Sequence, residues 1–341
     1  MSVPTIAIGR SANLTRVSDK PIALVTATFT GPGMDRLEEL CDVVYDPWID
    51  HRPMRIWDGR KLAERVGETG ATILICEADF VMGEVLDLPL LVIGSTRGDP
   101  TNVDVKRATE LGIPVLNAPG RNADGVAELT VALMFAVTRR IVLADSEMRS
   151  GDPFKDGTVP YQRHRAWQLA GRTAGLIGLG AVGRATRWRL EGLGMNVIAS
   201  DPFNPDATHS LDDLLAEADI VSMHATPNAS TFGMIGAAQF DAMRDGAFYI
   251  NSARAGLHDL DALVAALRSG KLSGAGLDHF DGEKLPEGHP LLDMDNVVLT
   301  PHIGGATYDT EINHSTMIAA DIEAVLTGGS PTHCVNPEVL P

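Results

Sequence analysis

The feature that most restricts the fold of this chain is a glycine-rich turn, Gly178-Leu179-Gly180-Ala181-Val182-Gly183. It follows an apolar run over residues 174–177 and leads into a segment with few helix breakers, residues 182–190. A strand, a GxGxxG turn and a helix in this order are typical of a dinucleotide site. The first glycine permits the tight turn, the second lets the backbone approach a pyrophosphate, and the third lets the helix pack against the strand.

A carboxylate beyond the next predicted strand indicates which dinucleotide is bound. The strand over residues 196–200 leads to Asp201, 18 residues after Gly183 (201 − 183). An acid there accepts hydrogen bonds from the ribose hydroxyls of NAD and repels the 2′-phosphate of NADP, while the helix N-terminus faces the phosphates. We therefore predict NAD, although a purely structural turn is the alternative. The predicted NAD contacts here are Gly178, Gly180, Ala181, Val182, Gly183 and Asp201.

Composition limits the partners and the compartment. The 341 residues suffice for two domains, and a net charge of −17 argues against nucleic acid or an anionic membrane as a partner. The three cysteines, Cys41, Cys76 and Cys334, are scattered and lack CxxC spacing, so we expect neither disulfides nor a metal site. The first 20 residues lack a signal-peptide core, and the longest apolar stretch, residues 126–137, is too short to span a membrane. A cytoplasmic protein is expected.

Alternating β and α patterns cover the chain and predict parallel sheets. In the first 117 residues, strands are expected over 22–26, 43–45, 71–76, 90–93 and 115–117, and helices over 34–40, 62–66 and 103–111. Residues 122–149 form the longest helical pattern, which we interpret as one helix crossing between two domains. After the glycine-rich turn, strands are expected over 220–223, 248–250, 274–277 and 297–299, and helices over 210–218, 260–267 and 309–326. The last of these helices is expected to return to the first domain.

Three residues that can carry chemistry follow predicted strands, where open α/β sheets bind ligands. Arg254 can hold a carboxylate with two parallel bonds, although a solvated surface arginine is equally compatible with its position. His302 lies among loop-forming residues, and Glu283 follows the preceding strand. If Glu283 reaches the second ring nitrogen of His302, the histidine becomes an acid/base whose tautomer the carboxylate determines. A structural histidine is the alternative.

Four segments together resemble a known family. The glycine-rich turn with Asp201, Asn251–Arg254, Leu277–Glu283 and Leu299–Gly305 look like those of the NAD-dependent D-2-hydroxyacid dehydrogenases, and most like the D-3-phosphoglycerate dehydrogenase branch. With the segment 121–130, the resemblance covers about residues 90–307.

The resemblance implies an α/β protein with two Rossmann-like domains. Residues 118–305 would form a doubly wound parallel sheet that binds NAD, and residues 1–117 with 306–341 a smaller flavodoxin-like domain for substrate. It implies reversible hydride transfer between NAD(H) and C2 of a small anionic 2-hydroxy or 2-keto acid, by a homodimer.

The resemblance also implies a role for each matching residue. Arg254 would hold the substrate carboxylate and polarise the keto oxygen, His302 would exchange the proton, and Glu283 would orient His302. Further NAD contacts would come from His224, Ala225, Thr226, Pro227, Ser252, Ala253, Asp278, Gly304 and Gly305. Substrate contacts would come from Ser95, Thr96, Arg97 and Gly98, together with Arg254.

Some positions depart from the family pattern and leave the substrate open. Ala255, His279 and Lys284 stand where glycine, valine and proline are common, yet no functional group is lost. Arg97 and Arg121 are extra cations that can bind a phosphate or lie on the surface. The alternatives are a glyoxylate/hydroxypyruvate reductase and a non-catalytic NADH-sensing corepressor; Glu283 argues against a formate dehydrogenase.

Overall fold

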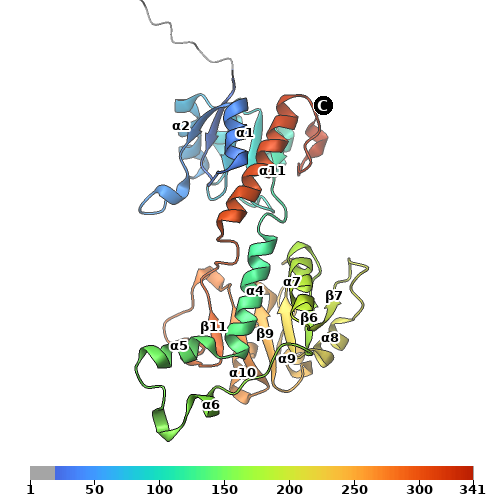
Figure 1. Ribbon diagram of the computed structural model, residues 1–341. Coiled ribbons are helices and arrows are strands. Elements are labelled where there is room, and N and C mark those ends of the chain that lie inside the picture. The colour runs from blue at the N-terminus through green and yellow to red at the C-terminus, as the bar shows by residue number, and fades with distance from the viewer. Residues whose placement is uncertain (1–19, 341) are drawn as a thin grey trace, which may run out of the picture. The chain divides into compact units, whose positions relative to one another are not determined.

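The computed structural model describes residues 20–340, which divide into two compact α/β units (Figure 1). One unit contains the described residues up to Pro119 together with those from His314 onward, and the other runs from Gly120 to Asn313. Both sheets are entirely parallel, so the predicted α/β fold with two Rossmann-like halves is confirmed. No helix among residues 20–340 combines the length and the apolar character needed to cross a membrane.

The first unit has a five-stranded sheet in the order β2-β1-β3-β4-β5. Its strands are β1 (Ile22–Val25), β2 (Asp42–Tyr45), β3 (Ile73–Cys76), β4 (Val92–Ser95) and β5 (Val115–Leu116). Its helices are α1 (Pro32–Leu40), α2 (Gly59–Thr69), α3 (Val105–Glu110) and the part of α11 (Tyr308–Leu326) from His314 onward. Every residue of β3 and β4 is buried, because helices cover both faces of a parallel sheet and its central strands need continuous apolar runs.

The alternation of side chains along β1 assigns the helices of this unit to opposite faces. Leu24 packs in one core with α2 and α3, whereas Ala23 and Val25 pack in another with α1 and α11. Helix α11 buries Ile318 and Ile322 in that second core. The predicted return of the last helix to the first domain is therefore confirmed.

The second unit has a six-stranded sheet in the order β11-β10-β9-β8-β6-β7. Its strands are β6 (Thr173–Ile177), β7 (Asn196–Ser200), β8 (Ile220–Met223), β9 (Ala247–Asn251), β10 (Leu272–Leu277) and β11 (Val297–Leu299). Its helices are α4 (Ala123–Thr138), α5 (Ile141–Arg149), α6 (Pro160–Arg163), α7 (Ala181–Gly192), α8 (Leu211–Glu217), α9 (Ala237–Ala242) and α10 (Leu260–Ser269). Helices α4 and α7 pack on one face, and α8, α9 and α10 pack on the other (Figure 1). The strand order reverses at β6, where such sheets bind ligands beyond the carboxyl ends of their strands.

The prediction of a single helix over residues 122–149 was wrong. Helix α4 ends at Thr138, and α5 begins at Ile141 after Arg140, which has a left-handed backbone with φ of 54°. No glycine or proline marks the break, so the apolar pattern looks continuous in the sequence. All of α4 lies within the second unit, so this helix does not cross between the two units.

Candidate active site

Each of the three glycines in the turn between β6 and α7 is a glycine for a different structural reason. Gly178 has φ of 96°, and a Cβ there would lie 2.7 Å from the backbone nitrogen of Ala225. A Cβ on Gly183 would lie 2.3 Å from the carbonyl oxygen of Gly178. A Cβ on Gly180 would meet nothing within 4 Å, although its backbone is unstrained. The fold itself therefore requires the first and third glycines, and the second leaves open space at the N-terminus of α7, as a bound pyrophosphate requires.

Asp201 lies beyond β7, and backbone groups orient its carboxylate. Oδ2 accepts a hydrogen bond from the Leu179 N–H at 2.8 Å, and Oδ1 accepts one from the Phe203 N–H at 2.9 Å. The first bond ties the acid directly to the glycine-rich turn. Each carboxylate oxygen retains a free lone pair, so the side chain can still accept bonds from ribose hydroxyls.

The segment His224–Pro227 follows β8 and lies beside the glycine-rich turn, as the close approach of Gly178 and Ala225 demonstrates. The His224 N–H donates to the Ile177 carbonyl at 2.7 Å, and its Nε2 lies 2.9 Å from the Ser222 hydroxyl. Its Nδ1 is buried without a partner in the described protein. Burial lowers the pKa of His224 to about 4, so the ring is neutral near pH 7.

The turn after β9 holds Arg254 at its end. The buried side chain of Asn251 accepts from the Ala253 N–H and donates to the Arg254 carbonyl, both at 2.9 Å. Ser252 is also buried, with its hydroxyl 2.6 Å from that of Thr130 on α4. Arg254 itself is exposed and donates from Nη1 to the Ala253 carbonyl, and no acidic side chain in residues 20–340 pairs with it. Its guanidinium remains available for an anionic ligand.

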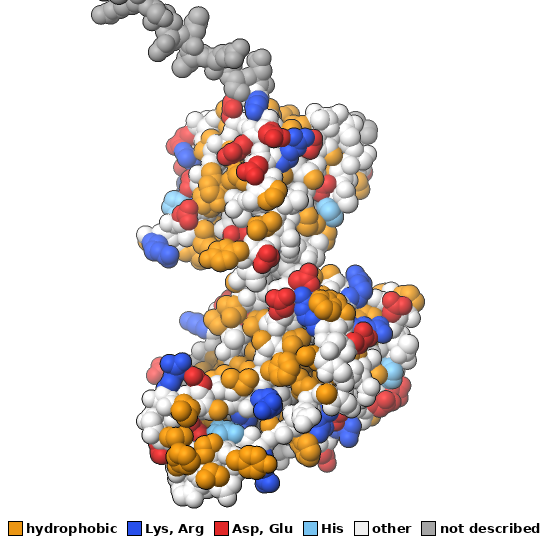
Figure 2. Space-filling model, viewed as in Figure 1, with side chains coloured by type: hydrophobic (Ala, Val, Ile, Leu, Met, Phe, Trp, Pro, Cys, Tyr) orange, Lys and Arg blue, Asp and Glu red, His pale blue; other side chains and the backbone are white. Residues whose placement is uncertain are grey.

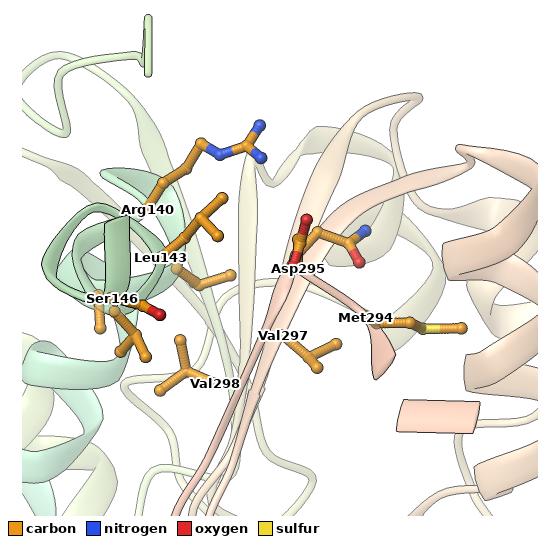
Figure 3. Close-up of a pocket in the computed structure, with 11 residues that line it drawn as sticks. Arg140, Leu143, Ser146, Met294, Asp295, Val297 and Val298 are labelled. Atoms are coloured by element: carbon orange, nitrogen blue, oxygen red, sulfur yellow. The ribbon is translucent and has the colours of Figure 1, made fainter. Parts of the chain in front are cut away.

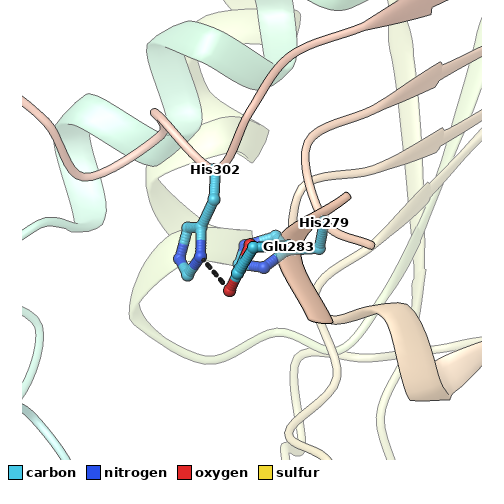
Figure 4. A group of neighbouring side chains, drawn as sticks. All are labelled: His279, Glu283 and His302. Atoms are coloured by element: carbon cyan, nitrogen blue, oxygen red, sulfur yellow. Dashed lines mark hydrogen bonds and ion pairs between the residues drawn. The ribbon is translucent and has the colours of Figure 1, made fainter. Parts of the chain in front are cut away.

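Glu283 and His302 form the predicted pair, with 2.8 Å between Glu283 Oε1 and His302 Nδ1 (Figure 4). Their φ values are 60° and 56°, which are unusual for residues other than glycine. The described chain has four such non-glycine residues, and two of them are this pair. A sparsely populated backbone conformation costs about 1–3 kcal/mol and is concentrated at functional sites. The fold therefore tolerates local strain in order to hold this carboxylate against this imidazole.

Asp278 organises the loop that carries His302. Its carboxylate is fully buried and accepts from the Thr300 hydroxyl at 2.6 Å and from the Ile303 and Gly304 N–H groups at 2.9 Å. A Cβ on Gly304 would lie 3.1 Å from Asp278 Oδ2, and a Cβ on Gly305 would lie 2.9 Å from Nδ2 of Asn122. The hydrogen bonds from Thr300, Ile303 and Gly304 to the Asp278 carboxylate therefore hold the loop in place.

Sequence reasoning noted His279 only as a departure from the family and missed its position. The His279 and His302 rings have centroids 3.8 Å apart, and His279 is only 6 % exposed. Burial, followed by electrostatic effects of His302 and Arg254, lowers the pKa of His279 to about 3. The His279 ring therefore lies against His302 and within the electrostatic influence of Arg254. The sequence did contain a signal for this position, because His279 lies between Asp278 and Glu283.

The predicted substrate loop of the first unit follows β4. Ser95 and Thr96 are fully buried, and the Ser95 hydroxyl donates to Asn102 Oδ1 at 3.1 Å. Arg97 donates from Nε to the Glu77 carbonyl at 2.7 Å and from Nη1 to the Thr101 hydroxyl at 3.3 Å. Its guanidinium therefore braces its own loop. Gly98 is exposed.

A cleft of about 200 Å³ with a mixed polar and apolar lining lies elsewhere in the second unit (Figure 3). Val137 of α4, Leu143 of α5 and Val298 of β11 contribute to its walls, and Arg140 stands at its edge. Its lining contains none of the predicted catalytic, NAD-binding or substrate-binding residues. We therefore do not assign the chemistry to this cleft.

Comparison with known proteins places these observations in a family. Residues 131–304 match the family described as D-isomer specific 2-hydroxyacid dehydrogenase, NAD binding domain. A glyoxylate reductase of Thermofilum pendens is 37% identical over 332 residues, which cover 94% of this chain and 96% of that protein. A D-3-phosphoglycerate dehydrogenase of Archaeoglobus fulgidus is 38% identical over 261 residues, but these cover 74% of this chain and only 48% of that protein. Among solved structures, the TT0316 protein from Thermus thermophilus has a TM-score of 0.78 and 36% identity, over 92% of this chain and 99% of that one.

Proposed function

The chain belongs to the D-isomer specific 2-hydroxyacid dehydrogenases, NAD-dependent oxidoreductases of CH–OH groups, and on that premise we propose that Arg254, Glu283 and His302 are its catalytic residues. The observation that carries the proposal is the 2.8 Å contact between His302 Nδ1 and Glu283 Oε1, formed by two residues in left-handed conformations. The exposed guanidinium of Arg254 supplies the complementary charge for an acidic substrate.

Each of the three side chains has a distinct task in reduction of a 2-keto acid. NADH, when bound, supplies the hydride that reaches C2. His302 donates the proton from Nε2 to the keto oxygen, because its Nδ1 faces Glu283. Glu283 accepts a hydrogen bond from the His302 Nδ1–H. This bond holds the imidazole in the orientation in which Nε2 points away from Glu283. Arg254 pairs with the substrate carboxylate and stabilises negative charge that develops on the oxygen. In the oxidising direction, His302 removes the hydroxyl proton.

We extend the proposal to the cofactor and substrate contacts. The N-terminus of α7 with Gly180 receives the pyrophosphate, and Asp201 binds the ribose hydroxyls. The segments 224–227, 252–253 and 304–305, with Asp278, line the remainder of the dinucleotide. Residues 20–117 with the C-terminal helix form the substrate domain, where the loop Ser95–Gly98 contacts the substrate.

The preferred substrate in this proposal is a small unphosphorylated 2-keto acid such as glyoxylate or hydroxypyruvate. The similarity to a glyoxylate reductase covers 94% of this chain, whereas the similarity to two D-3-phosphoglycerate dehydrogenases covers 74% of it. The guanidinium of Arg97 is also engaged with Glu77 and Thr101, so it is less available for a phosphate. D-3-phosphoglycerate is the second candidate, supported by 38% identity over 261 residues.

An NADH-oxidation screen tests the substrate assignment. We expect turnover with glyoxylate or hydroxypyruvate, and less with 3-phosphohydroxypyruvate, pyruvate and branched 2-keto acids. A higher kcat/KM for 3-phosphohydroxypyruvate would reverse the order of the two candidates. Absence of turnover with every 2-keto acid, with NADH still bound, would favour an NADH sensor instead.

His302→Ala tests the catalytic assignment. We expect unchanged NADH binding and turnover reduced by about 10²–10⁴-fold, since that is the usual contribution of general acid catalysis. His51→Ala is a matched control, because His51 also contacts a carboxylate, Asp46, at 2.7 Å and is similarly exposed. Near-normal turnover of His302→Ala would refute the assignment.

We further propose a homodimer in the cytoplasm. Apolar side chains are exposed throughout the segment that contains α5 and α6, and Figure 2 shows hydrophobic side chains gathered over this part of the second unit. A large exposed apolar patch is typical of an interaction surface, and a second copy of this chain can cover it. The exposed residues are Ile141, Val142, Met148, Phe154, Val159, Tyr161 and Trp167. The three free cysteines fit a reducing compartment.

Tyr161→Glu tests the dimer by placing a charge in this patch. We expect a shift from dimer to monomer in sedimentation equilibrium, because a buried unpaired carboxylate opposes association. Tyr308→Glu, at a similarly exposed tyrosine outside the patch, should leave the dimer intact. A wild-type protein that sediments as a monomer would contradict the proposal.

A further inference from the structure

Three potential metal ligands meet beside the proposed catalytic pair. His279, Glu283 and His302 each offer one ligand atom, and these atoms all lie within 4.8 Å of one another (Figure 4). Among residues 20–340, this is the one group of three or more histidine, cysteine or acidic side chains gathered so closely. His279 and Glu283 both follow β10, four residues apart (283 − 279), whereas His302 follows β11, so the third ligand comes from a more distant segment.

The chemistry of this donor set suits zinc. Two imidazole nitrogens and one carboxylate oxygen form a known three-ligand zinc set, which leaves a fourth position for water or substrate. Imidazole is a preferred ligand of Zn²⁺, and the absence of thiolate ligands disfavours Cu(I). The atoms require only small movements, because Glu283 Oε1 and His302 Nδ1 are already 2.8 Å apart.

The surroundings of the two histidines resemble the outer shell of a metal site. The Ser252 backbone lies beside the His279 ring, where it favours the protonated form of the imidazole. Metal-bound histidines usually donate their other ring N–H to a carboxylate, a backbone carbonyl or water, which directs the free nitrogen at the ion. His302 is held by the bond from its backbone N–H to the Asp278 carbonyl at 2.8 Å.

Access and charge also bear on binding at this cluster. The Glu283 and His302 side chains are 61% and 42% exposed, so an ion can enter from solvent without unfolding the loop. The positive charge of Arg254 acts on the His279 ring and opposes a cation there. We therefore expect reversible binding, weaker than at a closed structural zinc site.

We propose that His279, Glu283 and His302 bind Zn²⁺ and that the bound ion inhibits the dehydrogenase. The inhibition rests on the proposed function of His302, whereas ion binding does not. An ion at Nδ1 replaces the proton shared with Glu283 and leaves the single ring proton on Nε2. The ring then cannot act as an imidazolium acid, and it has no lone pair on Nε2 to act as a base.

Binding is tested with Co²⁺, whose visible ligand-field absorption reports tetrahedral coordination by nitrogen and oxygen. The metal-free full-length protein should bind one equivalent, and Zn²⁺ should displace it. His279→Val should weaken binding by more than about 100-fold, because loss of an outer-shell partner alone costs about 10–100-fold. His51→Val, in a histidine–carboxylate pair of similar length, is the matched control and should bind like the wild type. His279→Asn replaces the valine variant if circular dichroism finds the latter unfolded.

Inhibition is measured in the same proteins by NADH oxidation, first with a chelator and then with Zn²⁺. Zn²⁺ should abolish wild-type turnover reversibly, whereas His279→Val should retain its own chelator-treated rate at the same Zn²⁺ concentration. Failure of Co²⁺ to bind, or equal affinity of His279→Val, overturns the site. Binding without inhibition overturns the inhibitory role. An inactive metal-free wild type that still binds Co²⁺ would refute the proposed function while the site stands.

Discussion

At the level of single residues, Arg254 is exposed, and no acidic side chain in residues 20–340 pairs with it. Asn251 binds its backbone on both sides of the turn, so the main chain is held while the guanidinium remains exposed. An arginine placed in this way binds a carboxylate with two parallel hydrogen bonds. The rigidity of the turn determines where that carboxylate can lie.

Arg254→Ala should therefore weaken 2-keto acid binding as well as turnover. Hydrogen bonds to charged groups contribute about 1.5–3 kcal/mol, so kcat/KM should fall by about 10- to 100-fold or more. The KM for the keto acid should rise, while the Kd for NADH should stay constant. Arg268→Ala, at an exposed arginine of α10, should behave like the wild type. An unchanged KM in Arg254→Ala would exclude carboxylate binding by this residue.

At the level of secondary-structure elements, the turn between β6 and α7 contains one glycine that packing requires and one that packing does not require. Gly183 lies where a Cβ would overlap the Gly178 carbonyl, so this position serves the packing of α7 against β6. Gly180 has free space and ordinary backbone angles. Nothing in the protein alone requires a glycine there.

The pair Gly180→Ala and Gly183→Ala should therefore give opposite results. Gly180→Ala should keep the melting temperature of the wild type and bind NADH at least about tenfold more weakly, because its methyl group enters the space for the pyrophosphate. Gly183→Ala should lose about 1–3 kcal/mol of unfolding free energy, as overpacked sites do. Thermal unfolding and NADH fluorescence titration measure both. Normal NADH affinity in Gly180→Ala would contradict cofactor binding at this turn.

At the level of the whole molecule, buried histidines of the second unit link its stability to pH. Burial is the main cause that lowers the pKa of His224 and His258 to about 4 and that of His279 to about 3. The unfolded chain binds a proton at each histidine near pH 6.5, whereas the folded protein does not. Protonation therefore favours unfolding below that pH.

Stability should be constant above about pH 6.5 and decrease from there to about pH 4. Each histidine contributes a slope of at most about 1.4 kcal/mol per pH unit. Urea unfolding followed by circular dichroism at several pH values measures the total slope. His258→Asn should reduce the total slope by the contribution of one histidine. Asparagine is a suitable replacement, since Asn251 and Tyr249 contact His258 only through Nδ1. An unfolding free energy independent of pH over this interval would contradict the neutral buried state.

Local patterns were sufficient to predict the parallel sheets, the glycine-rich turn and the NAD cofactor. These features depend on neighbours a few positions apart. The apolar runs of β3 and β8 identify buried strands because a parallel sheet is covered on both faces. The glycines of the turn are recognisable because the backbone geometry and close packing there exclude other residues.

Contacts between distant segments could be decided only by the folded chain. The approach of Glu283 to His302 depends on the pairing of β10 with β11 and on two left-handed residues that no local preference favours. The contact between His279 and His302 depends on the same strand pairing. The helix break at Arg140 could not be predicted either, because no glycine or proline lies there. Side-chain periodicity specifies which face of an element is buried, but strand order and register specify which loops meet, and those arise only when the whole sheet has assembled.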